Sequence, residues 1–125
     1  MKTYAGWLFG TGAVFNVAIG LTVMFARPML AAELGIEAAQ GVNLVFGQLA
    51  GLLAAMIGVV YWLISREPER YRPLILLSAI GKLLAVAVVM IPFARGEIAG
   101  ALPLLVMGDL IYAGLFLDYL RRTRG

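Results

Sequence analysis

Residues 4–26, YAGWLFGTGAVFNVAIGLTVMFA, form an uncharged apolar stretch that decides the fold class. An α-helix needs about 20 apolar residues to cross a bilayer, so this stretch is long enough to span one. A secretory signal peptide fits less well, because its apolar region is only about 7–15 residues long. The stretch also carries Asn16 midway. We therefore interpret it as the first of several transmembrane helices.

Three further apolar stretches follow along the chain, separated by short polar segments. They cover residues 41–65, residues 73–94 with Lys82 inside, and residues 98–117 with Asp109 inside. None shows the alternation of apolar and polar residues that transmembrane β-strands need. Short connections favour antiparallel neighbours. The sequence thus predicts an all-α, integral membrane four-helix bundle in up-down-up-down order, with residues 1–125 as a single transmembrane domain.

The composition supports a membrane environment and excludes several chemistries. Hydrophobic residues make up 62% of the chain and the mean hydropathy is +0.94, whereas soluble domains are about 45–50% apolar. The chain has no cysteine and no histidine. Disulfides, thiol chemistry, histidine-held haem and nearly every zinc or copper site are therefore excluded. The net charge of +3 does not form a basic stripe with interleaved aromatic residues, so we expect no nucleic-acid partner.

The distribution of lysine and arginine predicts the orientation of the spans. Cytoplasmic connections of membrane proteins carry an excess of these residues. The side that holds both chain ends carries Lys2, Arg66, Arg70, Arg72, Arg121, Arg122 and Arg124, and the other side carries Arg27 and Arg95. We therefore expect both termini in the cytoplasm (N-in/C-in), in a bacterial inner (plasma) membrane. The aromatic residues expected as anchors at the inner interface are Tyr4, Trp7, Tyr61, Trp62, Tyr71 and Tyr119.

The first connection is longer than the others. Residues 28–39, PMLAAELGIEAA, begin with a proline and combine apolar positions with Glu33 and Glu37. This pattern is typical of a short amphipathic helix that lies on the external membrane surface. It would either rest on the bilayer as a simple linker or cover an outward-facing cavity as a lid.

Small residues predict where the helices touch, because transmembrane helices associate through close packing. The second stretch carries Gly47, Gly51 and Ala55 at intervals of four. We expect it to be the central, most tightly packed helix. The same spacing is only weak support for a homo-oligomer.

Two charged residues lie near the middle of the third and fourth stretches. A lone lysine or aspartate at a transmembrane helix centre costs about 2.5–3.5 kcal/mol. Lys82 and Asp109 lie on helices that are adjacent in sequence and expected to be antiparallel. We therefore expect them to pair inside the bundle. Asp118, one turn from Arg121 and Arg122, is expected at the solvated inner interface.

The charged pair has polar neighbours that extend it into a candidate ligand-binding site. Ser78 precedes Lys82 by four residues and Tyr112 follows Asp109 by three, so each shares a helix face with its charged neighbour. The candidate ligand-binding residues are Asn16, Gln48, Ser78, Lys82, Asp109 and Tyr112. The alternative is a structural clasp, in which Lys82 and Asp109 fix the pairing of two helices and nothing else.

Three functions remain open on the sequence. The first is binding or transport of a small polar or lipidic ligand at the polar cluster. The second is an accessory or assembly subunit of a larger membrane complex. An intramembrane acid–base enzyme with Lys82 and Asp109 as its acid–base pair is a minor third. GxGxxG and P-loop patterns are absent, so we expect no cofactor; membrane lipids, further copies or a larger complex are the expected partners.

The chain is similar in length and span number to the small multidrug resistance exporters. Those exporters rely on a membrane-embedded glutamate in the first helix, where this sequence has Asn16 and no acidic residue. The fluoride channels also have four spans, but their first-helix signature is not present. Because the similarity is one of size alone, neither drug export nor fluoride conduction is inferred.

Overall fold

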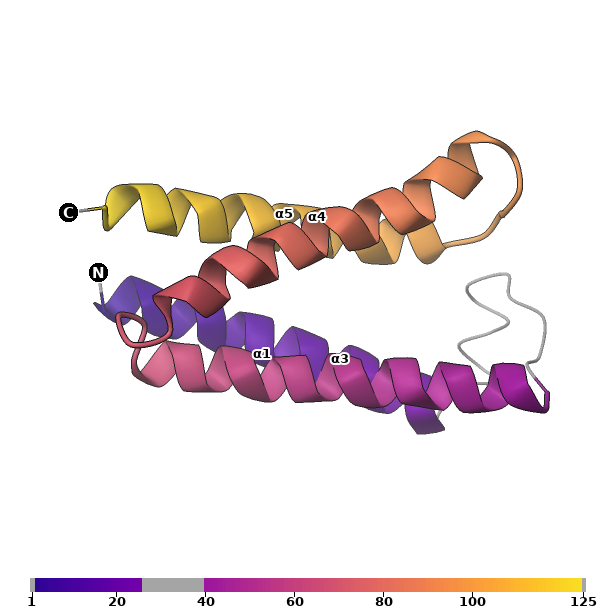
Figure 1. The fold of residues 1–125 in the computed structure, drawn as a ribbon, viewed down its shortest axis with the longest axis horizontal. Helices are drawn as coiled ribbons and strands as arrows, with labels where there is room; N and C mark the ends of the chain where they lie inside the picture. Colours follow the sequence, from indigo (N-terminus) through magenta and orange to yellow (C-terminus); the bar gives the residue numbers. More distant parts are fainter. Residues whose placement is uncertain (1, 26–39, 125) are drawn as a thin grey trace.

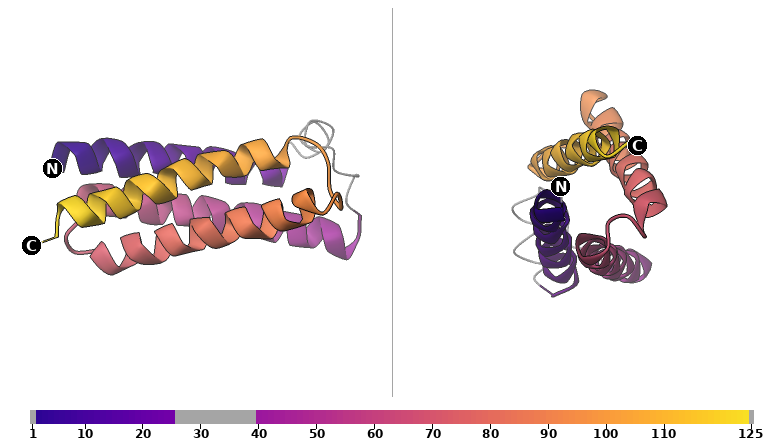
Figure 2. Two further views of the ribbon diagram at one scale, coloured as in Figure 1. Left: turned by 90° about the horizontal axis from the view of Figure 1, so that it is seen from above. Right: turned by 90° about the vertical axis from the view of Figure 1, so that its left-hand side faces the viewer.

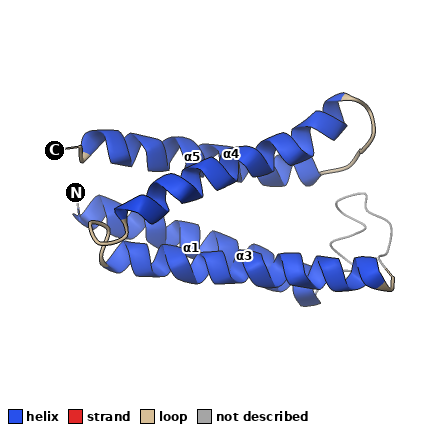
Figure 3. Ribbon diagram, viewed as in Figure 1, coloured by secondary structure: helices blue, strands red, loops and turns tan. Residues whose placement is uncertain are grey.

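The computed structural model describes residues 2–25 and 40–124, and within these ranges it contains helices and no strands (Figure 3). The helices are α1 (Lys2–Phe25), α3 (Val42–Arg66), α4 (Arg72–Ala94) and α5 (Leu102–Arg122). All four are long and apolar enough to cross a membrane. The predicted all-α class is confirmed. The predicted surface helix over 28–39 lies outside the described residues.

The exterior of the four helices is apolar. Val14, Phe25, Val88 and Leu104 are each between 70% and 76% exposed, and large apolar side chains are exposed on every helix. Soluble monomers rarely expose apolar patches larger than a few hundred Å². Such an exterior therefore indicates a membrane protein whose helices face lipid.

The fourth helix begins later than the sequence predicted. Gly96 and Gly100 have φ angles of 73° and 99°, a backbone region that glycine enters readily because it has no Cβ. These turns carry the chain as far as residue 101, so α5 begins at Leu102 rather than near residue 98 and extends to Arg122. Asp109 thus lies about 10 Å from the start of its helix, not at the helix centre.

The helices are arranged as two pairs. α1 packs along α3 and α4 packs along α5, whereas few residues join the two pairs. Figures 1 and 2 show that α4 moves away from α3 as it leaves the connection between them. We call the end that carries both chain termini, on the left in Figure 1, the terminal end, and the opposite end the loop end. The sequence prediction that α3 is the central helix is wrong, because α3 packs mainly against α1.

Glycines allow the backbones of α1 and α3 to approach closely. A Cβ atom placed on Gly51 would lie 2.7 Å from the carbonyl oxygen of Gly20, and one on Gly58 would lie 2.9 Å from the backbone nitrogen of Val17. Both distances are shorter than real Cβ contacts, so only glycine fits at these positions. Gly47, which belongs to the same predicted row, has nothing within 4 Å.

A core shared by all four helices lies toward the terminal end. Phe9 of α1 is its centre: its ring lies 4.8 Å from that of Phe116 and 5.5 Å from that of Tyr119, measured between centroids. Tyr61 of α3 lies 5.4 Å from Phe116 in an edge-to-face arrangement. The core members are Ala5, Leu8, Phe9, Ala13, Tyr61, Ile64, Ile75, Ala79, Phe116 and Tyr119.

Two of these core residues correct the sequence prediction. Tyr61 and Tyr119 were expected as aromatic anchors facing the membrane interface, but both are almost fully buried. They fill the space in which the two helix pairs meet, with ring contacts to Phe116 and Phe9. Their rings therefore stabilise the core rather than position the protein in the bilayer.

The shared core stops at the depth of Lys82. Among the described residues, α4 has no buried residue beyond Lys82, and α3 has none before Gly51. Beyond this depth, among the described residues, the buried core no longer contains members from both helix pairs. The two pairs are held together at the terminal end and lie apart at the other.

Arg72 joins α4 to α5 at the terminal end. It lies in the first turn of α4, and its guanidinium donates from Nη1 to Thr123 Oγ1 at 2.6 Å and from Nη2 to the Leu120 carbonyl at 2.7 Å. The last carbonyls of a helix lack partners within that helix. Arg72 therefore caps the end of α5 and fixes the start of α4 against it.

Candidate functional site

Lys82 and Asp109 form an ion pair where the shared core ends. Lys82 Nζ lies 2.6 Å from Asp109 Oδ1, and the Lys82 side chain is only 5% exposed. An ammonium group buried in an apolar interior is tolerated only when it is paired and hydrogen-bonded. The predicted direct pairing of α4 with α5 through these residues is confirmed.

Asn16 connects this ion pair to the other helix pair. Its Oδ1 accepts a hydrogen bond from Lys82 Nζ at 3.2 Å, and its Nδ2 donates to the Ala54 carbonyl at 3.2 Å. Hydrogen bonds thus run in series from Asp109 on α5 through Lys82 on α4 and Asn16 on α1 to Ala54 on α3. All four helices meet in this one network.

Aromatic rings surround the ammonium group of Lys82. Its Nζ lies 5.7 Å from the ring centroid of Phe15, 5.3 Å from that of Tyr61 and 5.6 Å from that of Tyr112. A cation within about 6 Å of a ring centroid is attracted by the negative face of the ring. Two oxygen acceptors and three rings of the chain itself therefore stabilise the charge of Lys82.

Asp109 is compensated less completely than Lys82. Lys82 binds Oδ1, while no hydrogen-bond partner for Oδ2 exists among the described residues. The Asp109 side chain is 22% exposed, compared with 5% for Lys82. A carboxylate can accept about four hydrogen bonds, so Asp109 presents an accessible acceptor that no other described residue uses.

The face of α4 that carries Lys82 stays open toward the loop end. Val86, Val89 and Phe93 follow Lys82 at helical spacing, and none of them is buried. On the terminal side, by contrast, Ala79 and Ile75 are fully buried on that face. Asp109 therefore lies where the shared core ends, beside a face of α4 that is only partly covered, while Val106 on its own helix is buried one turn toward the loop end.

Two further predicted residues take part in the cluster. Ser78, one turn before Lys82, lies beside the Tyr61 side chain. Tyr112, besides facing Lys82, donates its hydroxyl proton to Thr11 Oγ1 at 3.0 Å. Thr11 in turn donates to the carbonyl of Leu8 at 3.1 Å. Tyr112 therefore joins α5 to α1 and so links the two helix pairs.

Gln48 does not join the cluster. It precedes Tyr61 by thirteen residues, which at 100° per residue places it about 140° away around α3. Tyr61 faces Lys82, so Gln48 points away from the bundle interior, and its side chain is exposed. Gln48 was expected in the cluster from its depth along the helix, but its direction around α3 takes it away from Lys82.

Phe15 and Thr11 belong to the site but were not predicted. Phe15 lies over the backbone of Gly108, where a Cβ atom would come within 2.8 Å of its ring. The glycine therefore lets the Phe15 ring approach α5 beside Asp109. The available signal was the spacing of Thr11 and Phe15, because residues four apart share one face of a helix.

Comparison of the chain with protein-family models, curated proteins and solved structures found no match. The function must therefore be argued from the geometry alone.

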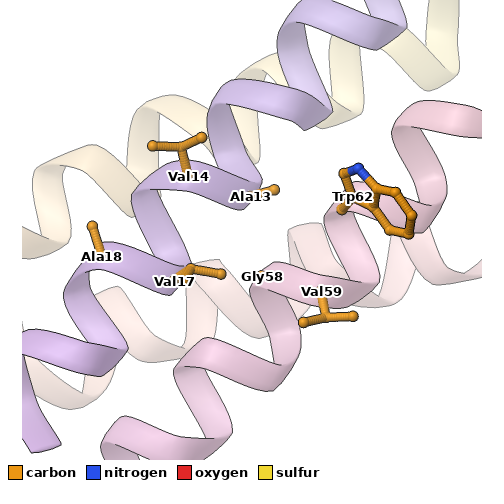
Figure 4. Close-up of a pocket in the computed structure, with 7 residues that line it drawn as sticks. All are labelled: Ala13, Val14, Val17, Ala18, Gly58, Val59 and Trp62. Carbon is orange, nitrogen blue, oxygen red and sulfur yellow. The ribbon is translucent and has the colours of Figure 1, made fainter.

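A concave surface away from this cluster lies between α1 and α3 and is lined almost entirely by apolar atoms. It is a shallow groove of about 420 Å³ lined by Ala13, Val14, Val17, Ala18, Gly58, Val59 and Trp62. Figure 4 shows Gly58 opposite Val17, with the Trp62 ring at one end of the groove. It contains no group that would select a ligand, so the polar cluster remains the candidate site. Among residues 2–25 and 40–124 no three acidic, histidine or cysteine side chains gather closely enough to hold a metal ion.

The hydrogen bond between Tyr112 and Thr11 gives a modest test of how the helix pairs are joined. Replacing Tyr112 by phenylalanine should lower the free energy of unfolding by about 0.6 kcal/mol, the average for such bonds between transmembrane helices. Reversible unfolding in detergent would measure it. Tyr4→Phe is the matched control, because no hydrogen bond of the Tyr4 hydroxyl is found among the described residues. Equal losses in both variants would contradict the assignment.

Proposed function

We propose that this chain is a four-span, up-down-up-down membrane protein that binds a small polar solute or a lipid headgroup beside Asp109. The observation that supports this most is the incomplete compensation of Asp109: one carboxylate oxygen has no partner among the described residues, and the side chain is 22% exposed. Ionisable residues inside a membrane are costly and mark functional sites by default. A pair with a purely structural role would be expected to satisfy both carboxylate oxygens.

The chemistry of Asp109 restricts the ligand. An ionised carboxylate only accepts hydrogen bonds, so the ligand must offer a donor: a hydroxyl, an amide or an ammonium group. Lys82 donates to Asp109 and Asn16 and is only 5% exposed, so we assign it the role of a fixed positive charge rather than of a ligand contact. A hydroxyl- or amine-bearing headgroup or small solute fits this requirement.

The proposed orientation sets the direction of approach. The terminal end carries Arg66, Arg70, Arg72, Arg121, Arg122 and Arg124, and an excess of arginine favours the cytoplasmic side. Both termini are therefore proposed to be cytoplasmic, in a bacterial inner membrane. The ligand would reach Asp109 from the external, loop end, while transport to the cytoplasm would also require the aromatic core to open.

An accessory subunit with a structural clasp is the second candidate. It is favoured by the burial of Lys82, whose hydrogen-bond partners all lie within the chain. It is also favoured by the loop-end half of α3, where Phe46, Leu49 and Leu53 are exposed. In this alternative a larger membrane complex would cover that apolar face.

Native mass spectrometry of protein released from its own membrane tests the ligand-binding proposal. The wild-type protein should carry a reproducible extra mass, and the same spectrum gives the number of copies. The double variant Lys82→Met/Asp109→Leu should lose this mass, because it removes the acceptor while leaving no unpaired charge. Asp118→Asn is the matched control: it removes an acid from the same helix at the terminal end and should retain the mass.

Either of two results would count against the proposal. A wild-type particle without any extra mass would favour the clasp and the accessory role. Identical sets of bound masses in the wild type and the double variant would place the ligand elsewhere. A stoichiometric protein that co-purifies with both the wild type and the double variant would support the accessory subunit.

A further inference from the structure

A basic groove lies between the start of α4 and the end of α5, away from the Asp109 cluster. Its volume is about 650 Å³, and Arg72, Arg121 and Arg124 form its polar rim while Leu76, Leu117 and Leu120 contribute apolar wall. The groove lies at the terminal end, where the spans reach the membrane surface in the proposed orientation. It therefore combines positive charge with exposed apolar surface at the depth of lipid headgroups.

The positive charge of this groove exceeds what the protein neutralises. Asp118 pairs with both Arg121, at 2.9 Å, and Arg122, at 2.8 Å, so one carboxylate serves two guanidinium groups. Arg72 donates to neutral oxygens only, and no ion pair of the Arg124 side chain is found among the described residues. At least two uncompensated positive charges thus face one groove.

Arg72 is held in position before any ligand arrives. Its two hydrogen bonds to Thr123 Oγ1 and the Leu120 carbonyl leave further N–H donors of its five free. A guanidinium group with a fixed orientation loses little side-chain entropy on binding, and its planar donors match the oxygens of a phosphate. Arg72 is therefore a preorganised phosphate contact.

The apolar wall favours an amphipathic ligand. Leu76 follows Arg72 by four residues and Leu117 precedes Arg121 by four, so each leucine lies about 6 Å deeper in the spans than its arginine. Leu76 is 47% and Leu117 is 39% exposed. A free anion would make no use of these side chains, whereas the acyl chains of a lipid would cover them.

We infer that this groove binds the headgroup of an anionic phospholipid. The lipid phosphate lies at the guanidinium groups of Arg72, Arg121 and Arg124, and the acyl chains run along Leu76 and Leu117. Basic pockets between transmembrane helices on the cytoplasmic side are suited to such headgroups. The site is independent of the proposed ligand at Asp109, since the two share no residue.

Lipid retention in native mass spectrometry tests this inference. Detergent-solubilised protein is exchanged into equal amounts of phosphatidylglycerol and phosphatidylcholine with identical acyl chains. The wild type should retain one phosphatidylglycerol per chain with at least a tenfold preference. The variant Arg121→Gln/Arg124→Gln should lose this preference. Arg72 is left intact, because its replacement would also remove the cap of α5.

The control is Arg66→Gln/Arg122→Gln, which removes the same charge at the same end from residues outside the groove. It should keep the preference for phosphatidylglycerol. Equal loss in both double variants would mean attraction by net charge alone and would overturn the site. Equal retention of the two lipids by the wild type would also overturn it.

Inorganic phosphate distinguishes a lipid site from a simple anion site. Under the lipid assignment, millimolar phosphate should neither displace phosphatidylglycerol nor raise the unfolding temperature as the lipid does. Two results would show that the apolar wall contributes nothing to binding and that the lipid assignment is wrong. One is displacement of the lipid by phosphate, and the other is an equal rise in the unfolding temperature with phosphate alone.

Discussion

Replacing Lys82 by methionine should lower the free energy of unfolding by about 3–5 kcal/mol, the usual cost of removing one partner of a buried ion pair. The substitution leaves Asp109 Oδ1 and Asn16 Oδ1 without the donor that both now share. Methionine is of similar length to lysine and fits between the rings of Phe15, Tyr61 and Tyr112. The loss should therefore come from electrostatics and not from packing.

A double-mutant cycle in mild detergent measures this loss. Asp109→Leu alone should cost a similar amount, because it leaves the Lys82 ammonium unpaired in an apolar interior. The double variant Lys82→Met/Asp109→Leu should be more stable than either single variant, since an uncharged replacement of a buried pair is often neutral. Leu84→Met, on an exposed position two residues from Lys82, should change stability by less than about 0.5 kcal/mol. Strictly additive losses would contradict direct pairing.

Replacing Gly20 by alanine should cost about 3 kcal/mol, the upper end of the range for overpacking. The added Cβ atom would lie 2.6 Å from the backbone nitrogen of Ala55 and still closer to the carbonyl oxygen of Gly51. Backbone atoms cannot move aside as a flexible side chain can. α1 and α3 would have to separate along their contact, and Asn16 would lose its alignment with the Ala54 carbonyl.

Gly10→Ala on the same helix is the matched control for this steric effect. Nothing lies within 4 Å of a Cβ atom at Gly10, and alanine is favoured over glycine inside a helix by roughly 0.5–1 kcal/mol. This variant should therefore be as stable as the wild type or slightly more stable. The same unfolding measurement compares the two. A harmless Gly20→Ala would show that the backbones of α1 and α3 are further apart than described.

The sequence predicted the helices and the charged pair because both follow from the cost of placing polar groups in lipid. The length of an uncharged apolar stretch predicts a membrane-spanning helix. Two lone, opposite charges on adjacent helices of this kind are expected to pair. The start of α5 was harder to predict from the sequence, because it depends on the positive φ angles of Gly96 and Gly100. A stretch that is apolar throughout does not reveal where the backbone turns.

The arrangement of the helices around the site could not be predicted from the same rules. Tyr61 is of a residue type that often anchors a helix at the membrane interface. Its ring lies in the core only because α1, α3 and α5 pack together at this point. The bond from Asn16 to the Ala54 carbonyl uses a backbone group that every sequence offers. The prediction that Gln48 belongs to the site failed for a related reason. The direction in which Gln48 points around α3 depends on which neighbour that helix packs against.

The pairing of α4 with α5 also affects how the chain enters the membrane. A single helix carrying Lys82 or Asp109 would insert with a penalty of about 2.5–3.5 kcal/mol. The two helices are joined by only the short segment 95–101 and contact each other along their length. We therefore expect the two helices to enter the bilayer together as one hairpin, in which Lys82 and Asp109 compensate each other. The ion pair would then reduce the penalty of insertion as well as stabilise the finished fold.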